Sequence, residues 1–369
     1  MSNFNLDIQF IDASNWQPSE WYSTGGSRAK KLLQDSEGKE YYFKCSEKKP
    51  AKDGKPEKHY KFEFWNEIIA YQLGKNLGLD ILRYDVAIYD GEIGCISHKM
   101  TISDEEQLLD IGRFMTAINP NFLPKDNSTR KEYTFQLLEQ TIDIFDVHDF
   151  WHYFFQTLLF DTIISNTDRH QENWAFIGNT TFIQKAFELI EKKVENKLFK
   201  NFKTIKKFIN WIWDKFNLNV ESASNTIGQQ IIFESWSIEK YAPIFDSGSS
   251  MARELTEARV ELLLSNEAEL NKYIDNGKAE LHWNNQKISH YNLIEELLNS
   301  SYLEQVKEAS VFMQNWHTDL VSSILAVVDK DVPNQFSQYR IPENRKQLIS
   351  KLLTLRFQKL NDLLNNARI

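Results

Sequence analysis

The chain is short of the residues that mark several structural classes. Only two of its 369 residues are cysteine, Cys45 and Cys95, which excludes a disulfide scaffold and a cysteine-rich zinc module. Glycine (13) and proline (8) are scarce and 41% of the residues are hydrophobic, which excludes collagen-like and disordered chains. No apolar run approaches the roughly 20 residues of a membrane-spanning helix. Residues 1–10 lack the basic-then-apolar order of a signal peptide. We therefore expect a soluble, cytoplasmic, globular protein.

Positive charge is also in deficit. Lys and Arg number 43 against 52 Asp and Glu, so the formal net charge is −9. A chain this acidic is a poor general binder of nucleic acid, although a local basic patch is compatible with that total. We expect contact with nucleic acid only through a partner.

The first hundred residues have the pattern of a small β-rich unit. Short runs of strand-forming residues, bounded by turn residues, predict strands at 30–33, 40–44, 84–89 and 93–97. Between the two strand pairs, apolar residues at helical spacing predict a helix over 62–77 that ends near Gly78.

The pattern after residue 100 is mainly helical. Residues 148–164 are apolar around most of the circumference and predict a buried helix, and 344–366 predict an amphipathic one. A basic stretch at 181–216 predicts a helical insertion that extends to about 235. The sequence therefore predicts an α+β fold with two lobes, a β-rich lobe at 1–100 and a larger helical lobe at 101–369.

The strongest chemical signal follows the predicted buried helix. Asp168 and Asn173 lie five residues apart in a polar turn, directly before an apolar run at 174–177. Phosphoryl transfer uses such a pair, because a carboxylate accepts the proton of the acceptor hydroxyl and an amide oxygen binds a metal ion near the phosphates. Both residues are also common in ordinary turns, so the pair by itself is a weak signal.

A second acid stands where an apolar run ends. Residues 241–245 predict a strand that ends at Asp246, and Gly248 would free the turn that follows. A carboxylate in this place can bind the Mg²⁺ that bridges nucleotide phosphates, since Mg²⁺ prefers one or two carboxylates plus phosphate oxygens and water.

A nucleotide also needs a cation. Lys44 closes a predicted strand, and Glu67 lies on the helix that follows, as in the ion pair that positions the α- and β-phosphates in protein kinases. Glu63, one turn earlier, competes with Glu67 as the partner. Lys99 and Met100 are predicted to contact the nucleotide only because they lie between the two predicted lobes.

The segment 23–30 offers a phosphate cradle. Gly25 and Gly26 let backbone N–H groups approach a phosphate, and Ser27 adds a hydroxyl. The pattern matches neither of the common glycine-rich nucleotide motifs, and a plain hairpin turn is the other interpretation.

The chain resembles the HipA-like Ser/Thr kinases. The likeness is carried by the stretches from Phe64 to Leu79, from Phe160 to Trp174 and from Tyr241 to Ser249, in this order. These kinases are the toxin kinases of bacterial toxin–antitoxin systems, and the likeness is to their compact, CtkA-type branch. It covers roughly residues 20–100 and 148–260.

The resemblance implies an ATP-dependent protein kinase, acting as a toxin or as a secreted effector. It assigns Asp168 as the catalytic base, Asn173 and Asp246 as Mg²⁺ ligands, and Lys44 as the ATP lysine. It also implies a loop whose serine is autophosphorylated, for which Ser23, Thr24 and Ser27 stand in the matching place. The expected partners are a protein substrate and an antitoxin or another small protein.

Two other functions are compatible with the same residues. Phosphoinositide kinases and antibiotic phosphotransferases share the spacing of Asp168 and Asn173, so a small molecule or a lipid is an alternative acceptor. A kinase fold that binds nucleotide or a partner without turnover is the other alternative, although the intact set of Lys44, Asp168, Asn173 and Asp246 argues against it.

Overall fold

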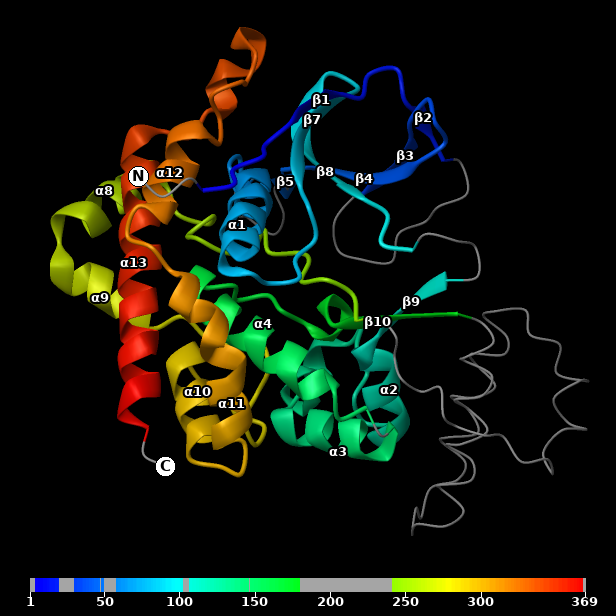
Figure 1. Cartoon of the computed structure of the whole chain (residues 1–369), viewed down its shortest axis with the longest axis vertical. Helices are drawn as coiled ribbons and strands as arrows, with labels where there is room; N and C mark the ends of the chain where they lie inside the picture. Colours follow the sequence, from blue (N-terminus) through cyan, green and yellow to red (C-terminus); the bar gives the residue numbers. More distant parts are fainter. Residues whose placement is uncertain are drawn as a thin grey trace, which may run out of the picture.

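The computed structural model describes residues 4–19, 30–46, 48–49, 58–101, 106–145, 147–179 and 241–367. A β-sheet with one long helix forms the N-terminal part, and a mainly helical part follows (Figure 1). This order confirms the α+β class predicted from the sequence. The predicted insertion at 181–235 lies outside the described residues, and the boundary near residue 100 stays a prediction.

Six strands form the main sheet in the order β1-β7-β8-β4-β3-β2. Strand β1 runs parallel to β7, and the other neighbours are antiparallel. The bounds are β1 Phe10–Asp12, β2 Gln17–Pro18, β3 Lys31–Gln34, β4 Glu40–Cys45, β7 Asp85–Tyr89 and β8 Glu92–His98. Two further antiparallel pairs are β5 (Lys48–Lys49) with β6 (Lys58–His59), and β9 (Glu106–Asp110) with β10 (Ala175–Asn179).

Helix α1 (Glu63–Leu77) joins the sheet to the helical part. Almost all its side chains are buried, and it packs against β8 on one side and against α12 and η3 on another. It ends at Gly78, whose φ of 87° suits a residue without a Cβ atom, and the N–H of Leu79 bonds to the carbonyl of Gly74 at 2.9 Å. The predicted helix and its end are therefore confirmed.

The helical part is built around α4 and the long C-terminal helix α13, which packs against α4, α8 and α12. The α-helices are α2 Ile111–Ile118, α3 Phe135–Phe145, α4 Phe150–Ile164, α8 Glu257–Ser265, α9 Glu267–Asp275, α10 His290–Leu298, α11 Leu303–Ala309, α12 Leu320–Val327 and α13 Glu343–Asn366. Short 3-10 helices are η1 Asn127–Glu132, η2 Gln171–Asn173, η3 Ser310–Asn315 and η4 Asn334–Tyr339.

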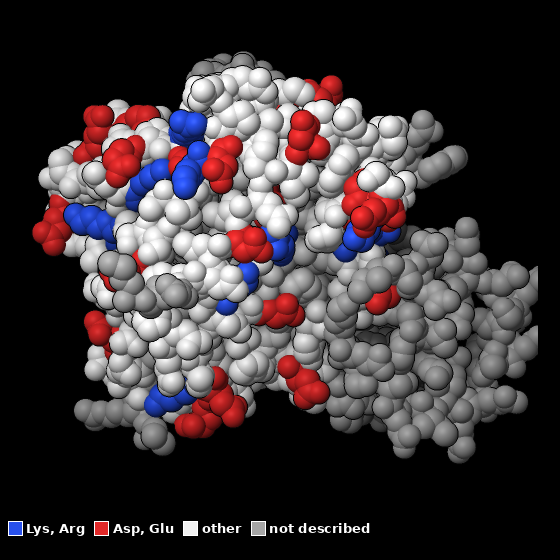
Figure 2. Space-filling model, turned by 45° about the horizontal axis from the view of Figure 1, so that its top comes forward, with Lys and Arg blue, Asp and Glu red and all other residues white. Residues whose placement is uncertain are grey.

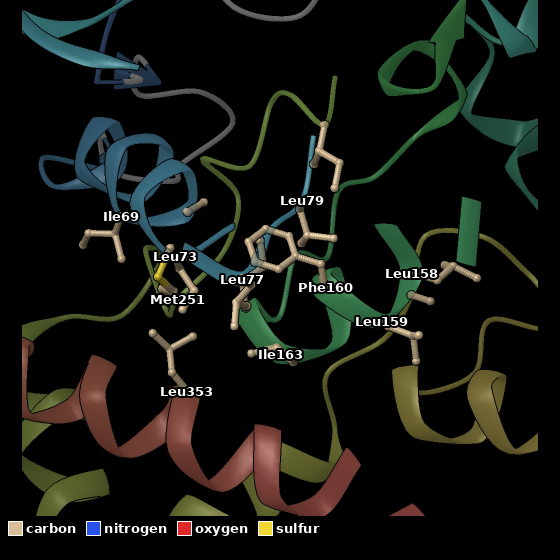
Figure 3. Close-up of a cluster of buried hydrophobic side chains, with 14 of the residues drawn as sticks. Ile69, Leu73, Leu77, Leu79, Leu158, Leu159, Phe160, Ile163, Met251 and Leu353 are labelled. Carbon is tan, nitrogen blue, oxygen red and sulfur yellow. The ribbon is translucent and has the colours of Figure 1, made fainter. Parts of the chain in front are cut away.

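One continuous hydrophobic core runs from α1 through α4 to α13. Figure 3 shows Ile69 and Leu73 of α1 facing Met251 and Leu353, while Phe160 and Ile163 of α4 lie beside them. This core continues across the junction of the sheet and the helical part. It therefore fixes α1, α4 and the chain around Met251 in relation to one another.

The expected strand at 241–245 is not regular. Tyr241 and Ile244 make only isolated bridges, with Phe176 and Ile81 respectively. Pro243 lies between them and has no N–H to donate to a ladder, which explains the interruption. The turn that follows also differs from expectation, because the positive φ falls at Asp246 (57°) and not at Gly248.

The surface carries mixed charge. On the face drawn in Figure 2, acidic and basic side chains occur in small mixed groups, and the described residues of this face form no continuous basic surface. Within the described ranges, no helix combines the length and apolar character that crossing a membrane requires.

Candidate functional site

Lys44 of β4 makes two buried ion pairs. Its Nζ atom lies 3.1 Å from Oε1 of Glu67 on α1 and 2.8 Å from Oδ1 of Asp246. The three side chains are only 8%, 2% and 12% exposed. Burial alone would lower the pKa of Lys44, but the carboxylates of Asp246 and Glu67 outweigh burial and hold this pKa well above its usual value. Three residues that are far apart in the sequence therefore meet in one cluster around a cationic lysine.

The two candidate glutamates of α1 have different partners. Oε1 of Glu63 accepts a hydrogen bond from Nη1 of Arg253. Glu67 binds Lys44 with Oε1, and its Oε2 accepts the backbone N–H of Ser247 at 2.7 Å. Of the two glutamates that the sequence left open, Glu67 is the one beside Lys44, and it also holds the chain next to Asp246.

Residues 245–252, here called the Asp246 segment, are held in an unusual backbone conformation. Asp246, Met251 and Ala252 all have positive φ values, between 48° and 62°. Each such residue costs on the order of 1 kcal/mol and persists only where the surroundings enforce it. Asn66 of α1 supplies part of that enforcement, because its amide nitrogen donates to the carbonyls of Gly248 (3.3 Å) and Ser250 (2.6 Å).

Residues 165–173, here called the Asp168 loop, begin where α4 ends. Ser165 takes a left-handed conformation (φ 56°) that turns the chain out of the helix. The side chain of Asn166 then donates to Oδ1 of Asp161 on α4 at 3.2 Å and accepts the backbone N–H of Asp168 at 3.2 Å. Oδ2 of Asp168, a half-buried carboxylate, accepts a hydrogen bond from Oγ of Ser249 at 3.1 Å. The loop is therefore attached both to α4 and to the Asp246 segment.

Arg169 makes a second connection between loop and segment. Its guanidinium binds both oxygens of Asp161, at 2.8 and 2.9 Å, and donates to the carbonyl of Phe245 and to Oγ of Ser247. Burial alone would lower the pKa of Arg169, but the Asp161 carboxylate raises it above the usual value. Charge-assisted, bidentate bonds of this kind give strong geometric control. Asp168 precedes Arg169 in the chain, and Asp246 lies between Phe245 and Ser247, which Arg169 binds. Arg169 thus holds Asp168 and Asp246 in one frame.

Asn173 ends η2 and is buried. Its Nδ2 atom donates to the backbone carbonyl of Asp168 at 3.2 Å, so the amide is oriented by the loop itself. The amide oxygen of Asn173 and the carboxylate of Asp246 are the oxygen ligands that Mg²⁺ prefers when phosphates and water complete its shell. No group of three or more His, Cys, Asp or Glu able to hold a metal is found in the described part of the chain. Asn173 and Asp246 offer one amide oxygen and one carboxylate, which fits a metal whose remaining ligands come from phosphates and water.

Two predicted nucleotide contacts lie at the end of β8. Lys99 forms an ion pair with Glu40, and its backbone N–H bonds to the carbonyl of the same residue at 2.9 Å. Met100 is half-buried and packs against a small apolar cluster of Ala175, Ile177, Ala242 and Phe245. Met100 is therefore near the Asp246 segment through Phe245, whereas Lys99 is paired with Glu40. Gly25, Gly26 and Ser27, with Ser23 and Thr24, lie outside the described residues.

Sequence reasoning missed the residues that build the frame. Asp161 and Arg169 bind each other across the end of α4, and Asn66 and Ser249 tie down the Asp246 segment. Asp161 carried a detectable signal, since a charged residue within an apolar helix requires a buried partner. Asn66 and Ser249 had no role assigned, because a single sequence does not show such distant contacts. The carbonyls that Asn66 binds are 182 and 184 residues away, and the carboxylate that Ser249 binds is 81 residues away.

The sheet, the helical part and the buried lysine–glutamate pair together define a kinase-like fold. The structure is similar to the crystal structure of CtkA, a proinflammatory kinase of Helicobacter pylori, with a TM-score of 0.62. The match covers 97% of this chain and 98% of that chain at 17% sequence identity, so it shows a shared fold over nearly the full length. The sequence matches no protein-family model and no curated protein.

Proposed function

We propose that the chain is an ATP-dependent serine/threonine protein kinase of the HipA-like type that requires Mg²⁺. The observation that supports this most directly is the cluster of Lys44, Glu67 and Asp246, tied to Asp168 by the hydrogen bond from Ser249. A cation, a carboxylate that can bind a metal and a candidate base within one hydrogen-bonded frame support the proposal, because phosphoryl transfer uses these three kinds of group.

In this reaction the oxygen of a serine or threonine hydroxyl forms a bond to the γ-phosphorus of ATP. The bond from that phosphorus to the bridging β–γ oxygen breaks, its electrons stay on the ADP oxygen, and the hydroxyl proton passes to the Asp168 carboxylate. Lys44 binds the α- and β-phosphates and is itself oriented by Glu67. When bound, Mg²⁺ neutralises phosphate charge, and Asp246 and Asn173 are the residues that would hold it.

The first test is transfer from labelled ATP by the purified chain, with Mg²⁺ and a general protein acceptor. We expect label on serine or threonine, on the chain itself and on the acceptor. Asp168→Ala and Asp246→Ala should each abolish labelling, whereas Asp362→Ala, which removes an exposed carboxylate on α13, should not. Labelling that persists in both site variants would reject the assigned roles.

A panel of acceptors tests the substrate class. Transfer to lipids or to small molecules, with none to protein, would keep the phosphotransferase and reject the protein kinase. Nucleotide binding with no transfer to any acceptor would favour a silent binding module.

The proposed role as a toxin or effector has its own experiment. Expression of the wild-type chain should arrest growth of a bacterial host, or alter a host cell to which it is delivered, and Asp168→Ala should not. A comparison of phosphorylated proteins in the two cultures would identify the target, and co-purification would identify an antitoxin or other partner.

A further inference from the structure

The hydroxyl of Ser249 contacts the carboxylate of Asp168 directly. Its Oγ atom donates to Oδ2 of Asp168 at 3.1 Å. Ser249 is only 5% exposed, so the bond forms away from bulk water, where it is stronger and costly to leave unmade.

The position of Ser249 is fixed on both sides by backbone bonds. Its own carbonyl accepts the N–H of Thr167 at 3.3 Å, and the N–H of Met251 bonds to the carbonyl of Ile164 at 2.9 Å. The carbonyls of its two neighbours in the chain, Gly248 and Ser250, are both bound by Asn66. A donor held this firmly loses little entropy when it binds its acceptor.

We propose that Ser249 is a positioning residue for the candidate base. A donor on one oxygen restricts rotation of the Asp168 carboxylate and holds it in the orientation in which it meets the acceptor hydroxyl. This inference rests on the proposed kinase function and adds to it a residue from the Asp246 segment. The Asp246 segment and the candidate base are then aligned by the bond from Ser249 as well as by Arg169.

The hydroxyl of Ser249 donates to Asp168 as the hydroxyl of an acceptor would, which raises the question of self-phosphorylation at this residue. Its burial argues against that role, and so does charge. A phosphate on Ser249 would bring about two negative charges next to Asp168 and only three residues from Asp246. Mapping of phosphorylated residues in the wild-type chain decides the point, and label on Ser249 would overturn the positioning role.

The experiment compares Ser249→Ala and Ser249→Thr with the wild-type chain. We expect Ser249→Ala to lower kcat roughly 10-fold, since orientation is part of what a general base contributes, while KM for ATP and the dissociation constant of the nucleotide stay within about 2-fold. Ser249→Thr keeps the hydroxyl and should recover most of the lost rate. Should Ser249→Ala not fold, Ser249→Cys, which offers a weaker donor of similar shape, gives the same comparison.

Thr141→Val is the matched control, because it removes a fully buried hydroxyl that bonds to the Leu137 carbonyl on α3. It should lower Tm without lowering kcat. A wild-type kcat in Ser249→Ala, together with an inactive Asp168→Ala, would overturn the positioning role and leave the kinase intact. Equal loss in the alanine and threonine variants would also overturn it. A wild-type chain that transfers no phosphate would overturn both proposals.

Discussion

The ammonium group of Lys44 lies 2.8 Å from the carboxylate of Asp246, closer than its 3.1 Å distance to Glu67. The lysine assigned to the nucleotide phosphates is thus bound to the carboxylate assigned to the metal. Because both contacts are buried, removal of the lysine would take away a positive charge that two carboxylates share.

We therefore expect the Lys44→Met variant to lose phosphotransfer activity. We also expect its stability to depend on Mg²⁺. Without metal, its free energy of unfolding should fall by about 3–5 kcal/mol, the usual cost of breaking a buried pair. Added Mg²⁺ should restore part of this loss by binding to the carboxylates that no longer pair with the lysine, and this gain should be larger than in the wild-type chain. Thermal unfolding across a Mg²⁺ series measures both effects.

Lys48→Met is the control for this prediction. Lys48 pairs with Glu92 at 3.2 Å, but the two side chains are 51% and 43% exposed. An exposed pair of this kind contributes about 1 kcal/mol or less. Equal losses in the two methionine variants would contradict the buried, two-partner environment of Lys44.

The pair of Arg169 and Asp161 should behave as one unit. Both side chains are almost fully buried, at 4% and 1% exposure. Arg169→Met leaves the buried Asp161 carboxylate without the charge of its arginine partner, with the amide of Asn166 still bound to it, and should cost about 3–5 kcal/mol of stability. Asp161→Asn should also destabilise the fold, and the double variant should lose clearly less than the sum.

Chemical unfolding of all four proteins gives this coupling energy. Phosphotransfer should stay low in the double variant even where stability returns, because the bonds from Arg169 to Phe245 and Ser247 are lost in it as well. Additive losses in stability would show that the two side chains act independently.

The sequence predicted the local elements of this site better than the links between them. Helix α1 and its end at Gly78 follow from apolar spacing and from a glycine that tolerates positive φ, both of which are local signals. The β7–β8 hairpin follows in the same way from Asp90 and Gly91, which both have positive φ. Local chemistry was therefore sufficient for these parts.

Long-range pairing was not predictable in the same way. Strand β1 pairs with β7 across more than seventy residues, and β9 pairs with β10, although neither β1 nor β9 has a strong strand pattern. The run at 241–245 does have an apolar pattern but forms only bridges, since Pro243 interrupts it. Tertiary contacts decide such segments, and a single sequence does not show which contacts form.

Gly94 lies where β8 passes close to Lys44. A Cβ atom on Gly94 would overlap the backbone carbonyl oxygen of Lys44 on β4. We therefore expect Gly94→Ala to displace this part of β4, to lower stability by about 1–3 kcal/mol and to weaken nucleotide binding. Thermal unfolding and nucleotide titration measure the two effects.

Gly178→Ala, on β10, serves as the control for Gly94→Ala. A Cβ atom there would lie 3.5 Å from Cδ1 of Leu109, an ordinary contact. Its stability should be unchanged or slightly higher, because alanine reduces the freedom of the unfolded chain. A Gly94→Ala variant that binds nucleotide as the wild type does would contradict the close approach of the two strands.

His290, at the start of α10, should make the fold sensitive to acid. Burial, with the nearby charge of Arg356, lowers the pKa of His290 to about 3, whereas an unfolded chain has a histidine pKa of about 6.5. As the pH falls below about 6.5, the unfolded chain gains a proton that the folded chain does not, so stability decreases until about pH 3.

His290 should change the free energy of unfolding by about 1.4 kcal/mol per pH unit in this range. We expect His290→Gln to show a smaller loss of stability between pH 6 and pH 4 by roughly this slope. Chemical unfolding at a series of pH values measures it, and equal slopes in wild type and His290→Gln would show that His290 is protonated in the folded chain.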